Sequence, residues 1–474
     1  MSRSFFIISC FAACLIFLPS ARAELPQLGD PTQKEISPFQ EYLMGKNFYK
    51  TLRTNLPFID DLIVNDYLNT LGQKLVSQTD HGEQEFKFFI LNVPNINAFA
   101  GPDAHIGIHS GLFLAAHNES ELAGVVAHEI SHVTQRHLAR AMTEASISPA
   151  AAFAAIIAGI IVGSQSPDAG AAIIYGGSAA VMQSQINFTR HNEYEADREA
   201  VNVLRKSSIN PRGMADFFDT LLSQSESNNV FAQMEYLRTH PLSSNRVAEA
   251  RHRMKAGDQK LADDSLNFQL CKARLAVIST RSLQNLINRL TQMAPDKQSV
   301  VTRYTLAASL IAQGKPDQAI SILKQIIKES DHPWIQITLA EAYKNDGQVD
   351  KGRVVMEKLN KIYPNYLPVS LTYTELLGLS NKYKEAIALL RKLLQQHQQP
   401  LIYQQLAQNY FADGQTALAL EATSYQYELD GYLQLAAQQI DNALKQANLD
   451  KSSRQRLESR QQQLASQILR EQRN

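Results

Sequence analysis

The spacing of apolar residues predicts a small unit of mixed α and β structure near the start of the chain. Apolar positions recur at helical spacing over residues 40 to 77, and residues 86–93, "FKFFILNV", are typical of a strand. Residues 95–101 break the pattern with two asparagines and a glycine, and a proline precedes them. Residues 105–113 then alternate well enough to predict a second strand or hairpin arm.

A long amphipathic helix is expected over residues 119–142. Asn118 followed three residues later by Glu121 matches the capping-box arrangement at a helix start. An apolar face at helical spacing follows, made of Leu122, Val125, Val126, Ile130 and Val133.

Two uncharged, small-residue segments follow at 149–163 and 171–182. Each is shorter than the roughly 20 residues that span a bilayer. One interpretation is a pair of buried or partly exposed helices that pack over a neighbouring site. The other is a hairpin that touches a membrane or grips a substrate, because an exposed apolar patch of that size calls for such a role. A hairpin that spanned the bilayer would make the protein a membrane-embedded enzyme.

Beyond residue 255 the chain has helical periodicity to its end, and this part repeats every 33 to 34 residues. Positions able to adopt positive φ recur at this period, and small residues follow five positions later. The first set is Gly314, Gly347, Asn381 and Gly414, and the second is Ala319, Gly352, Ala386 and Ala419. The pattern resembles tetratricopeptide repeats, whose stacked helix pairs form a groove that holds a peptide or partner.

Composition narrows the classes of partner. Lys plus Arg and Asp plus Glu both number 46, so no net basic charge is available to attract nucleic acid. The contents of 44% hydrophobic and 19% charged residues indicate a globular protein, neither disordered nor built of many membrane spans.

The first 23 residues predict an export signal. Arg3 precedes an apolar run over residues 5–18, and Ala-Arg-Ala at residues 21–23 is typical of a cleavage site. Lipid attachment at Cys10 or Cys14 is the minor alternative. Cleavage after residue 23 leaves Cys271 as the one cysteine, so no internal disulfide can form in an oxidising compartment.

The predicted helix over 119–142 contains His128, Glu129 and His132 in the pattern H-E-x-x-H. Residues four apart project from one face of a helix, so both imidazoles can bind one cation while Glu129 points at a water as general base. Two imidazoles and a carboxylate suit Zn²⁺, whose open position acidifies water. The alternative is two surface histidines on a helix.

A third ligand must come from elsewhere in the chain. The extended H-E-x-x-H-x-x-G-x-x-H pattern is excluded because residue 135 is Gln and residue 138 is Leu. His137 would lie on another face of a continuous helix.

The best donor is the charged helical segment at residues 190–200. Glu193 and Asp197 lie one turn apart on one face, so one carboxylate could bind the metal and the other a histidine ring or the substrate. On spacing alone they could equally be surface charges. Glu195 and Glu199 lie around the helix and are interpreted as solvated surface charges.

Four motifs together resemble the M48 family of gluzincin metallopeptidases, and their order and spacing also match. They are N-A-F-A at residues 97–100, H-E-I-S-H at 128–132, R-x-x-E-x-x-A-D at 190–197, and T-H-P at 239–241 followed by Arg246.

The resemblance implies that His128, His132 and Glu193 bind zinc and that Glu129 is the catalytic base. Asp197 would lie just behind the ligands and is sometimes assigned as a proton donor. His240 would lie near the metal, where it would either stabilise the transition state or occupy the open metal position in a resting, self-inhibited state.

The resemblance also implies a substrate-binding edge that includes Asn97 and Phe99. An extended peptide would add to the strand near residues 106–109, and Arg246 or a backbone group would help hold the oxyanion. This sequence departs from the family where Pro-Gly-Gly often follows N-A-F-A, because residues 102–104 are Pro-Asp-Ala. The departure makes strand pairing along that edge less secure.

The expected fold class is α+β and predominantly α. The expected domains are a signal peptide at 1–23, an M48-type zincin-like peptidase domain with a small sheet at 24–260, and a tetratricopeptide-like helical repeat domain at 261–474.

The resemblance implies a periplasmic zinc endopeptidase, associated with the outer membrane, that cleaves misfolded or stalled outer-membrane barrel proteins. The repeats would recruit the substrate or the barrel-assembly complex, with peripheral membrane contact through residues 149–182. The alternative is a chaperone or scaffold for outer-membrane protein assembly whose peptidase site is silenced by His240.

Overall fold

The computed structural model describes residues 36–144, 148–166, 169–170, 173, 179–226, 236–294, 298–447 and 449–473. The predicted export signal at residues 1–23 lies outside this part of the chain.

A three-stranded sheet lies at the centre of the peptidase part. It contains β1 (Lys87–Leu91), β2 (Ala98–Gly101) and β3 (His105–His109) in the order β1-β3-β2. β3 pairs in parallel with β1 and antiparallel with β2, so it is the central strand. The expectation that a substrate strand adds near residues 106–109 is therefore wrong, because both sides of β3 are already hydrogen-bonded. Within the described residues β2 is bonded on one side only, which makes β2 the edge.

The turn between β2 and β3 contains the predicted departure from Pro-Gly-Gly. Asp103 and Ala104 both have positive φ, 54° and 52°, a conformation that glycine adopts more readily. The Asp103 carboxylate accepts from Lys87 Nζ at 3.0 Å, which ties the turn to β1. The turn is thus formed without glycines.

The second predicted strand, at residues 105–113, is shorter than predicted. It ends at His109 because α3 (Ser110–Ala115) begins directly after that residue.

The helix that carries H-E-x-x-H ends earlier than its periodicity predicts. α4 (Glu119–Thr134) begins as expected, with the Asn118 side chain accepting from the Glu121 N–H at 3.0 Å. The chain then turns at Arg136, whose φ is 53°, and α5 (His137–Glu144) begins in a new direction. The predicted continuous helix over 119–142 is therefore two helices.

The apolar segment at 149–163 forms α6 (Pro149–Gly163). Phe153, Ile157 and Ile160 are buried in a cluster with residues of α1 (Pro38–Asn55) and α5. This agrees with the interpretation of a packed helix over the site. Most of the second segment, 171–182, lies outside the described residues. In the part of the chain that is described, no helix is long and apolar enough to cross a membrane.

The remaining helices of the peptidase part surround the sheet and α4. They are α2 (Leu62–Val76), α8 (Ala179–Lys206), α9 (Arg212–Glu226), α10 (Tyr236–Thr239), α11 (Ser244–His252) and a 3₁₀ turn at Asp258–Lys260. α4 packs against α8 and α9. This packing brings Glu193 of α8 within 3.4 Å of His128 and of His132 on α4.

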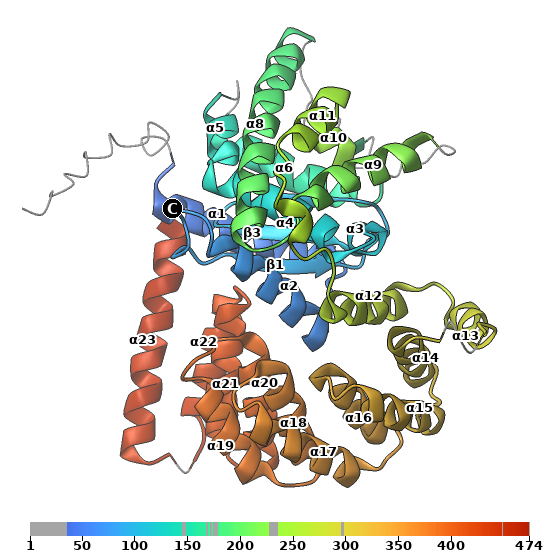
Figure 1. The fold of residues 1–474 in the computed structure, drawn as a ribbon. Coiled ribbons are helices and arrows are strands. Elements are labelled where there is room, and N and C mark those ends of the chain that lie inside the picture. Colours follow the sequence, from blue (N-terminus) through green and yellow to red (C-terminus); the bar gives the residue numbers. More distant parts are fainter. Residues whose placement is uncertain are drawn as a thin grey trace, which may run out of the picture.

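The repeat part is a curved stack of antiparallel helices (Figure 1). Its helices are α12 (Leu266–Ser279), α13 (Leu283–Thr291), α14 (Val300–Ala312), α15 (Pro316–Glu329), α16 (Pro333–Asn345), α17 (Val349–Ile362), α18 (Leu367–Leu379), α19 (Tyr383–Leu393), α20 (Pro400–Ala412), α21 (Thr416–Leu429), α22 (Leu433–Leu444) and α23 (Lys451–Arg473). The predicted positive-φ positions are confirmed at Gly314, Gly347, Asn381 and Gly414, with φ of 79°, 74°, 57° and 76°.

Replacing Gly347 by Ala should lower the free energy of unfolding by about 1–2 kcal/mol, the cost of a left-handed conformation for an L-residue. A Cβ there would meet nothing within 4 Å, so the effect is conformational and not steric. The control is Gly257→Ala, where space is equally open but φ is −89°. Urea unfolding should show a lower midpoint for Gly347→Ala alone; equal midpoints for both variants would contradict this explanation.

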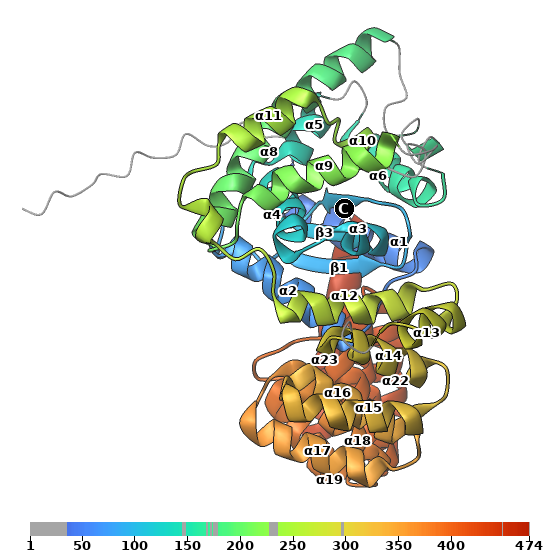
Figure 2. The same cartoon turned by 45° about the vertical axis from the view of Figure 1, so that its right-hand side comes forward.

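The stack packs against the peptidase part through α2 (Figures 1 and 2). The Arg274 side chain of α12 is 13% exposed and donates to Asp61, the cap of α2, at 2.7 Å and to Glu341 of α16 at 2.8 Å. The ring of Tyr67 on α2 lies 6.3 Å from that of Trp334 on α16. The two parts therefore share a hydrophobic core.

The far end of the stack also reaches the peptidase part. α23 runs back along the molecule toward α1 (Figure 1), where Glu471 accepts from Lys46 Nζ at 3.2 Å. The Lys50 Nζ lies 5.0 Å from the centroid of the Tyr432 ring at the start of α22. The curved stack is thus held at both ends.

Candidate metal centre

Four side chains from three segments of the chain lie close together between α4 and α8. His128 and His132 project from one face of α4, Glu193 from α8, and His240 from the residue after α10. Each offers one ligand atom, and these atoms all lie within 4.8 Å of one another. Three of the four side chains are buried, and the fourth, that of His132, is 13% exposed. The sequence-predicted ligands are therefore brought together, with His240 beside them.

The spacing of the ligand atoms fits a tetrahedral zinc ion. Nε2 of His128 lies 3.0 Å from Nε2 of His132, 3.4 Å from Oε2 of Glu193 and 3.3 Å from Nδ1 of His240. Metal–ligand bonds of 2.0–2.2 Å in a tetrahedron separate the ligands by about 3.3–3.6 Å. The distances to Glu193 and His240 fall in this range, and the distance between the two helix histidines is slightly shorter. The residues present therefore suit the metal that the motif implies.

The electrostatics of the cluster also favour a cation. His128 is fully buried, and burial opposes its charged form, yet the close carboxylates of Asp197 and Glu193 raise its pKa to about 10. The pKa of Glu193 is well below its usual range: burial raises it, but His240, Arg246 and His128 more than offset this. The same negative field that holds a proton on His128 would stabilise a divalent ion in its place.

Glu129 lies beside the cluster with an unused acceptor. Its side chain is 1% exposed, and its Oε1 has no hydrogen-bond partner within the described structure. Burial raises its pKa, while His240 and His128 act in the opposite direction. Because a general base works best with a pKa near the operating pH, a carboxylate shifted upward is suited to proton transfer.

Asp197 and Arg246 lie behind the ligands. Asp197 Oδ1 lies 3.0 Å from His128 Nδ1 and so directs Nε2 of that ring into the cluster. Arg246 donates to Asp197 from Nε at 2.7 Å and from Nη2 at 2.8 Å, and to the Pro241 carbonyl at 2.9 Å. Its Nη1 also lies 2.8 Å from Glu193 Oε2, an ion pair. In this structure the Arg246 donors are directed at the two acids and at the Pro241 carbonyl, and Asp197 lies against the ring of a ligand histidine. The oxyanion role of Arg246 and the proton-donor role of Asp197 stay predictions.

His137 and Glu195 form a second support that the sequence analysis missed. His137 Nδ1 lies 2.8 Å from Nδ1 of His132, and His137 Nε2 lies 3.2 Å from Oε2 of Glu195. That carboxylate oxygen also accepts from Arg140 at 2.9 Å. Glu195 is thus not a solvated surface charge. Because Glu195 accepts, His137 donates from Nε2 and accepts at Nδ1, which leaves Nε2 of His132 free for a metal.

Replacing His137 by Phe should weaken zinc binding about 10- to 100-fold, the usual cost of losing a partner behind a ligand histidine. His137→Gln should preserve binding, because an amide can accept from His132 and donate to Glu195. Competition with a chromophoric chelator measures the affinity. Glu199→Gln, on the same helix as Glu195, serves as the control and should bind like the wild type; a His137→Phe variant with unchanged affinity would contradict the role.

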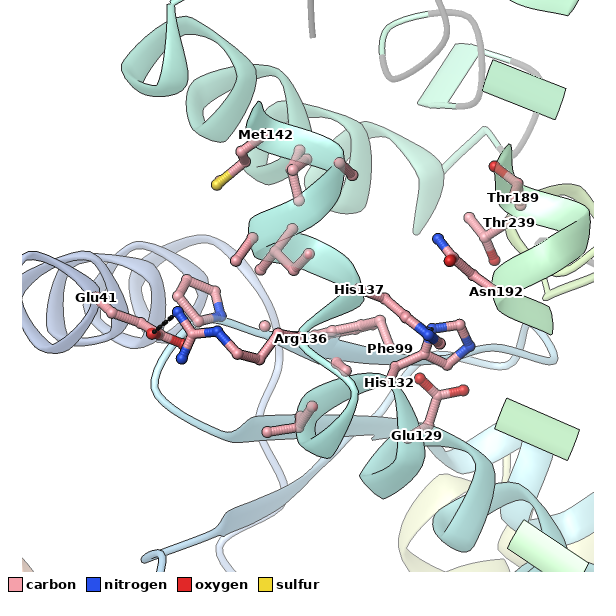
Figure 3. Close-up of a pocket in the computed structure, with 18 of the residues that line it drawn as sticks. Glu41, Phe99, Glu129, His132, Arg136, His137, Met142, Thr189, Asn192 and Thr239 are labelled. Atoms are coloured by element: carbon pink, nitrogen blue, oxygen red, sulfur yellow. Dashed lines mark hydrogen bonds and ion pairs between the residues drawn. The ribbon is translucent and has the colours of Figure 1, made fainter. Parts of the chain in front are cut away.

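The two other predicted substrate-binding residues are placed differently. Phe99 of β2 lines the cavity that opens from the ligand cluster, together with Glu129 and His132 (Figure 3). Asn97 is only 2% exposed and is not among the residues that line this cavity. Phe99 therefore faces the cavity beside the cluster and Asn97 does not, while the substrate-binding role of both residues stays a prediction.

Fold and site together define an H-E-x-x-H metallopeptidase that continues into a stack of helical repeats. A family model described as peptidase family M48 matches residues 63–254, and a tetratricopeptide repeat model matches residues 310–368. The chain belongs to peptidase family M48 and carries tetratricopeptide repeats.

Two relatives of known name extend over most of the chain, and a third extends over less than half of it. The beta-barrel assembly-enhancing protease of Escherichia coli strain K12 is 33% identical over 371 residues, which cover 70% of this chain and 76% of that protein. The protein of the same name in Yersinia pestis is 31% identical over 379 residues, covering 72% and 78%. The metalloprotease LoiP of Escherichia coli is 30% identical over 189 residues, covering 40% of this chain and 70% of LoiP.

Proposed function

We propose that this metallopeptidase is a zinc-dependent endopeptidase with His128, His132 and Glu193 as ligands and Glu129 as general base. The observation that carries the proposal is the buried Oε1 of Glu129, which has no hydrogen-bond partner in the described structure and lies beside four ligand atoms at zinc-like spacing. The alternative of two surface histidines on a helix does not explain why three carboxylates are buried beside them. These are the carboxylates of Glu129, Glu193 and Asp197.

The residues divide the chemistry between them. When bound, zinc polarises the scissile carbonyl and makes water acidic enough to react at neutral pH. Glu129 accepts the proton of the attacking water and passes it to the leaving amine. Asp197 and His137 fix the two imidazole rings. Tyr236, whose ring stacks on His240 at 4.7 Å between centroids, holds that ring in place.

The site is tested by elemental analysis of the mature protein. We expect one zinc per chain in the wild type, and less than one in His132→Ala, which loses a ligand. Absence of zinc from a wild type purified without chelators and dialysed against zinc would contradict the ligand assignment.

For the substrate, we propose misfolded or stalled outer-membrane barrel proteins in the periplasm. The support is the name of the relatives that match 70% of the chain or more, together with a repeat stack of the kind that binds peptides or partners. The export-signal pattern of residues 1–23 supports the periplasmic location. On this proposal the repeats recruit the substrate or the barrel-assembly complex, and residues 149–182 provide a peripheral contact with the membrane.

A second candidate is a chaperone or scaffold whose peptidase site rests in a self-inhibited state. The observation that favours it is the position of His240, whose Nδ1 lies 3.0 Å from Glu193 Oε1 and 3.3 Å from His128 Nε2. That is the place of a fourth ligand, where the ring would exclude water.

Cleavage of an unfolded barrel protein by wild type and His240→Ala separates the two candidates. Self-inhibition predicts faster cleavage by His240→Ala, whereas stabilisation of the transition state by His240 predicts slower cleavage. If neither zinc-loaded protein cleaves, the peptidase proposal fails and the scaffold remains.

A further inference from the structure

Asn192 of α8 is a buried polar side chain that serves neither a ligand nor the general base within the described contacts. It is 5% exposed, and its Oδ1 has no hydrogen-bond partner in the described structure. Burying an amide oxygen without a partner costs free energy, so such atoms are few in folded proteins. Asparagine is also a poor residue for the interior of a helix. Its presence in the middle of α8 therefore calls for a reason other than stability.

The Asn192 amide lies in the cavity that opens from the ligand cluster. Asn192 lines this cavity together with Glu129, Glu193 and His240. Figure 3 shows its side chain extending from α8 toward the side of the cavity where Glu129 and His132 lie. In the described part of the chain, Glu129 Oε1 likewise has no hydrogen-bond partner. Two unused acceptors, one from α4 and one from α8, therefore belong to one cavity.

Donors of the protein around the cluster are engaged elsewhere. Thr239 lines the same cavity, but its hydroxyl donates to the Tyr236 carbonyl at 3.2 Å. Arg246 donates to Asp197 from Nε at 2.7 Å and from Nη2 at 2.8 Å. The partner of Asn192 Oδ1 is therefore expected from a molecule that enters the cavity.

A peptide backbone has the chemistry that fits this side chain. A carboxamide offers an acceptor oxygen and two N–H donors, and each peptide group offers one N–H donor and one acceptor C=O. The two groups can pair whatever side chains the peptide carries, and an uncharged amide requires no charge on the substrate. Because Asn192 directly precedes the ligand Glu193 in α8, a backbone bound to it is held close to the metal site.

We propose that Asn192 binds the substrate backbone beside the scissile bond, with Oδ1 accepting from a peptide N–H and Nδ2 donating to a peptide carbonyl. The proposal rests on the proposed peptidase function and adds a substrate-binding residue to the same site. These hydrogen bonds fix a peptide group relative to Glu129 and the ligands, and such positioning lowers the barrier to reaction. They do so for substrates of different sequence, because every residue except proline carries the same backbone groups.

The test replaces single backbone N–H groups of a peptide by ester oxygens, which removes one donor and keeps the shape. The probe is a fluorescent octapeptide of casein, compared with its single-ester analogues for binding to zinc-loaded Glu129→Gln. One ester should bind about 3- to 10-fold more weakly than the parent peptide, the net value of one hydrogen bond. With Asn192→Leu in the same background, that ester and the parent peptide should bind equally. Wild type should cleave the parent peptide beside that position.

Asn202→Leu is the matched control, because it makes the same change at an exposed position of α8. It should leave the ester effect unchanged. Zinc content is measured on every variant, so that a loss of metal is not mistaken for a loss of the backbone contact. Asn192→Ala replaces Asn192→Leu in the comparison if the leucine variant does not fold.

Each result has a separate meaning. An ester effect that is the same at every position with and without Asn192→Leu would overturn the proposal, and so would its equal loss in Asn202→Leu. If the effect depends on Asn192 but neither wild type nor His240→Ala cleaves the parent peptide, the backbone contact stands and the proposed peptidase function is overturned. If the peptide is cleaved and the ester effect is independent of Asn192, only the role of Asn192 is overturned.

Discussion

Replacing Glu129 by Gln should lower kcat for peptide hydrolysis by about 10²–10⁴-fold, the usual contribution of a positioned general base. Gln has nearly the same shape but cannot accept the proton of the attacking water. Glu129 supplies no ligand atom to the cluster, so the variant should retain one zinc per chain. The loss should therefore appear in kcat and not in metal content.

Glu199→Gln is the matched control, because it removes a carboxylate from α8 outside the cluster and should leave kcat unchanged. Steady-state rates on an unfolded substrate, with zinc measured on the same samples, decide the matter. A Glu129→Gln variant that cleaves at the wild-type rate would show that another group is the base. A variant that loses both zinc and activity would show that Glu129 supports the ligands.

Replacing Arg246 by Ala should lower the free energy of unfolding by about 3–5 kcal/mol, the cost of breaking a buried ion pair on one side. The Arg246 side chain is 3% exposed and neutralises both Asp197 and Glu193. Its removal leaves two buried carboxylates without their shared cation. Bound zinc would supply positive charge beside Glu193, so the loss should be larger in the metal-free protein.

Arg251→Ala on the same helix is the control. Its side chain is 59% exposed and pairs with Asp219 at the surface, so it should cost less than about 1 kcal/mol. Urea unfolding with and without zinc compares the two variants. Equal stabilities for Arg246→Ala and Arg251→Ala in the metal-free protein would show that the buried network contributes nothing.

Local rules predicted much of this structure. The two histidines of H-E-x-x-H meet because four residues make about one turn of α4. The glycines and Asn381 adopt positive φ because the repeat turns demand it. In each case the cause lies within a few residues of the effect, so a single sequence contains the necessary information.

The end of α4 was mispredicted because its cause is not local. No glycine or proline marks the break, and the left-handed residue is Arg136, a residue type in which that conformation is uncommon. The apolar spacing continues from α4 into α5 and hides the change of direction. The displaced His137 thereby reaches the back of His132, a contact that a straight helix forbids.

The order of the strands in the sheet also could not be predicted from the local pattern of apolar residues. Every residue of β3 is buried, which is typical of a central strand, and Gly107 gives space to the rings of Phe99 and Phe89 on its two neighbours. Gly107, a glycine within the predicted strand, is the sequence feature that could have indicated the central position of β3. The contacts of Arg246 could not be predicted at all, since its partner Asp197 lies 49 residues away in the sequence.

The shared core has a consequence for how the chain is made. The Tyr366 hydroxyl donates to Asp66, 300 residues earlier, and Lys46 meets Glu471 across 425 residues. At a synthesis rate of about 5–20 residues per second, Glu471 of α23 is made roughly 20–85 s after Lys46 of α1. The side of α2 that packs against α12 and α18 likewise lacks these partners until they are made, although α4 and β1 cover its other side. The peptidase part therefore completes its core only when its own repeats are present.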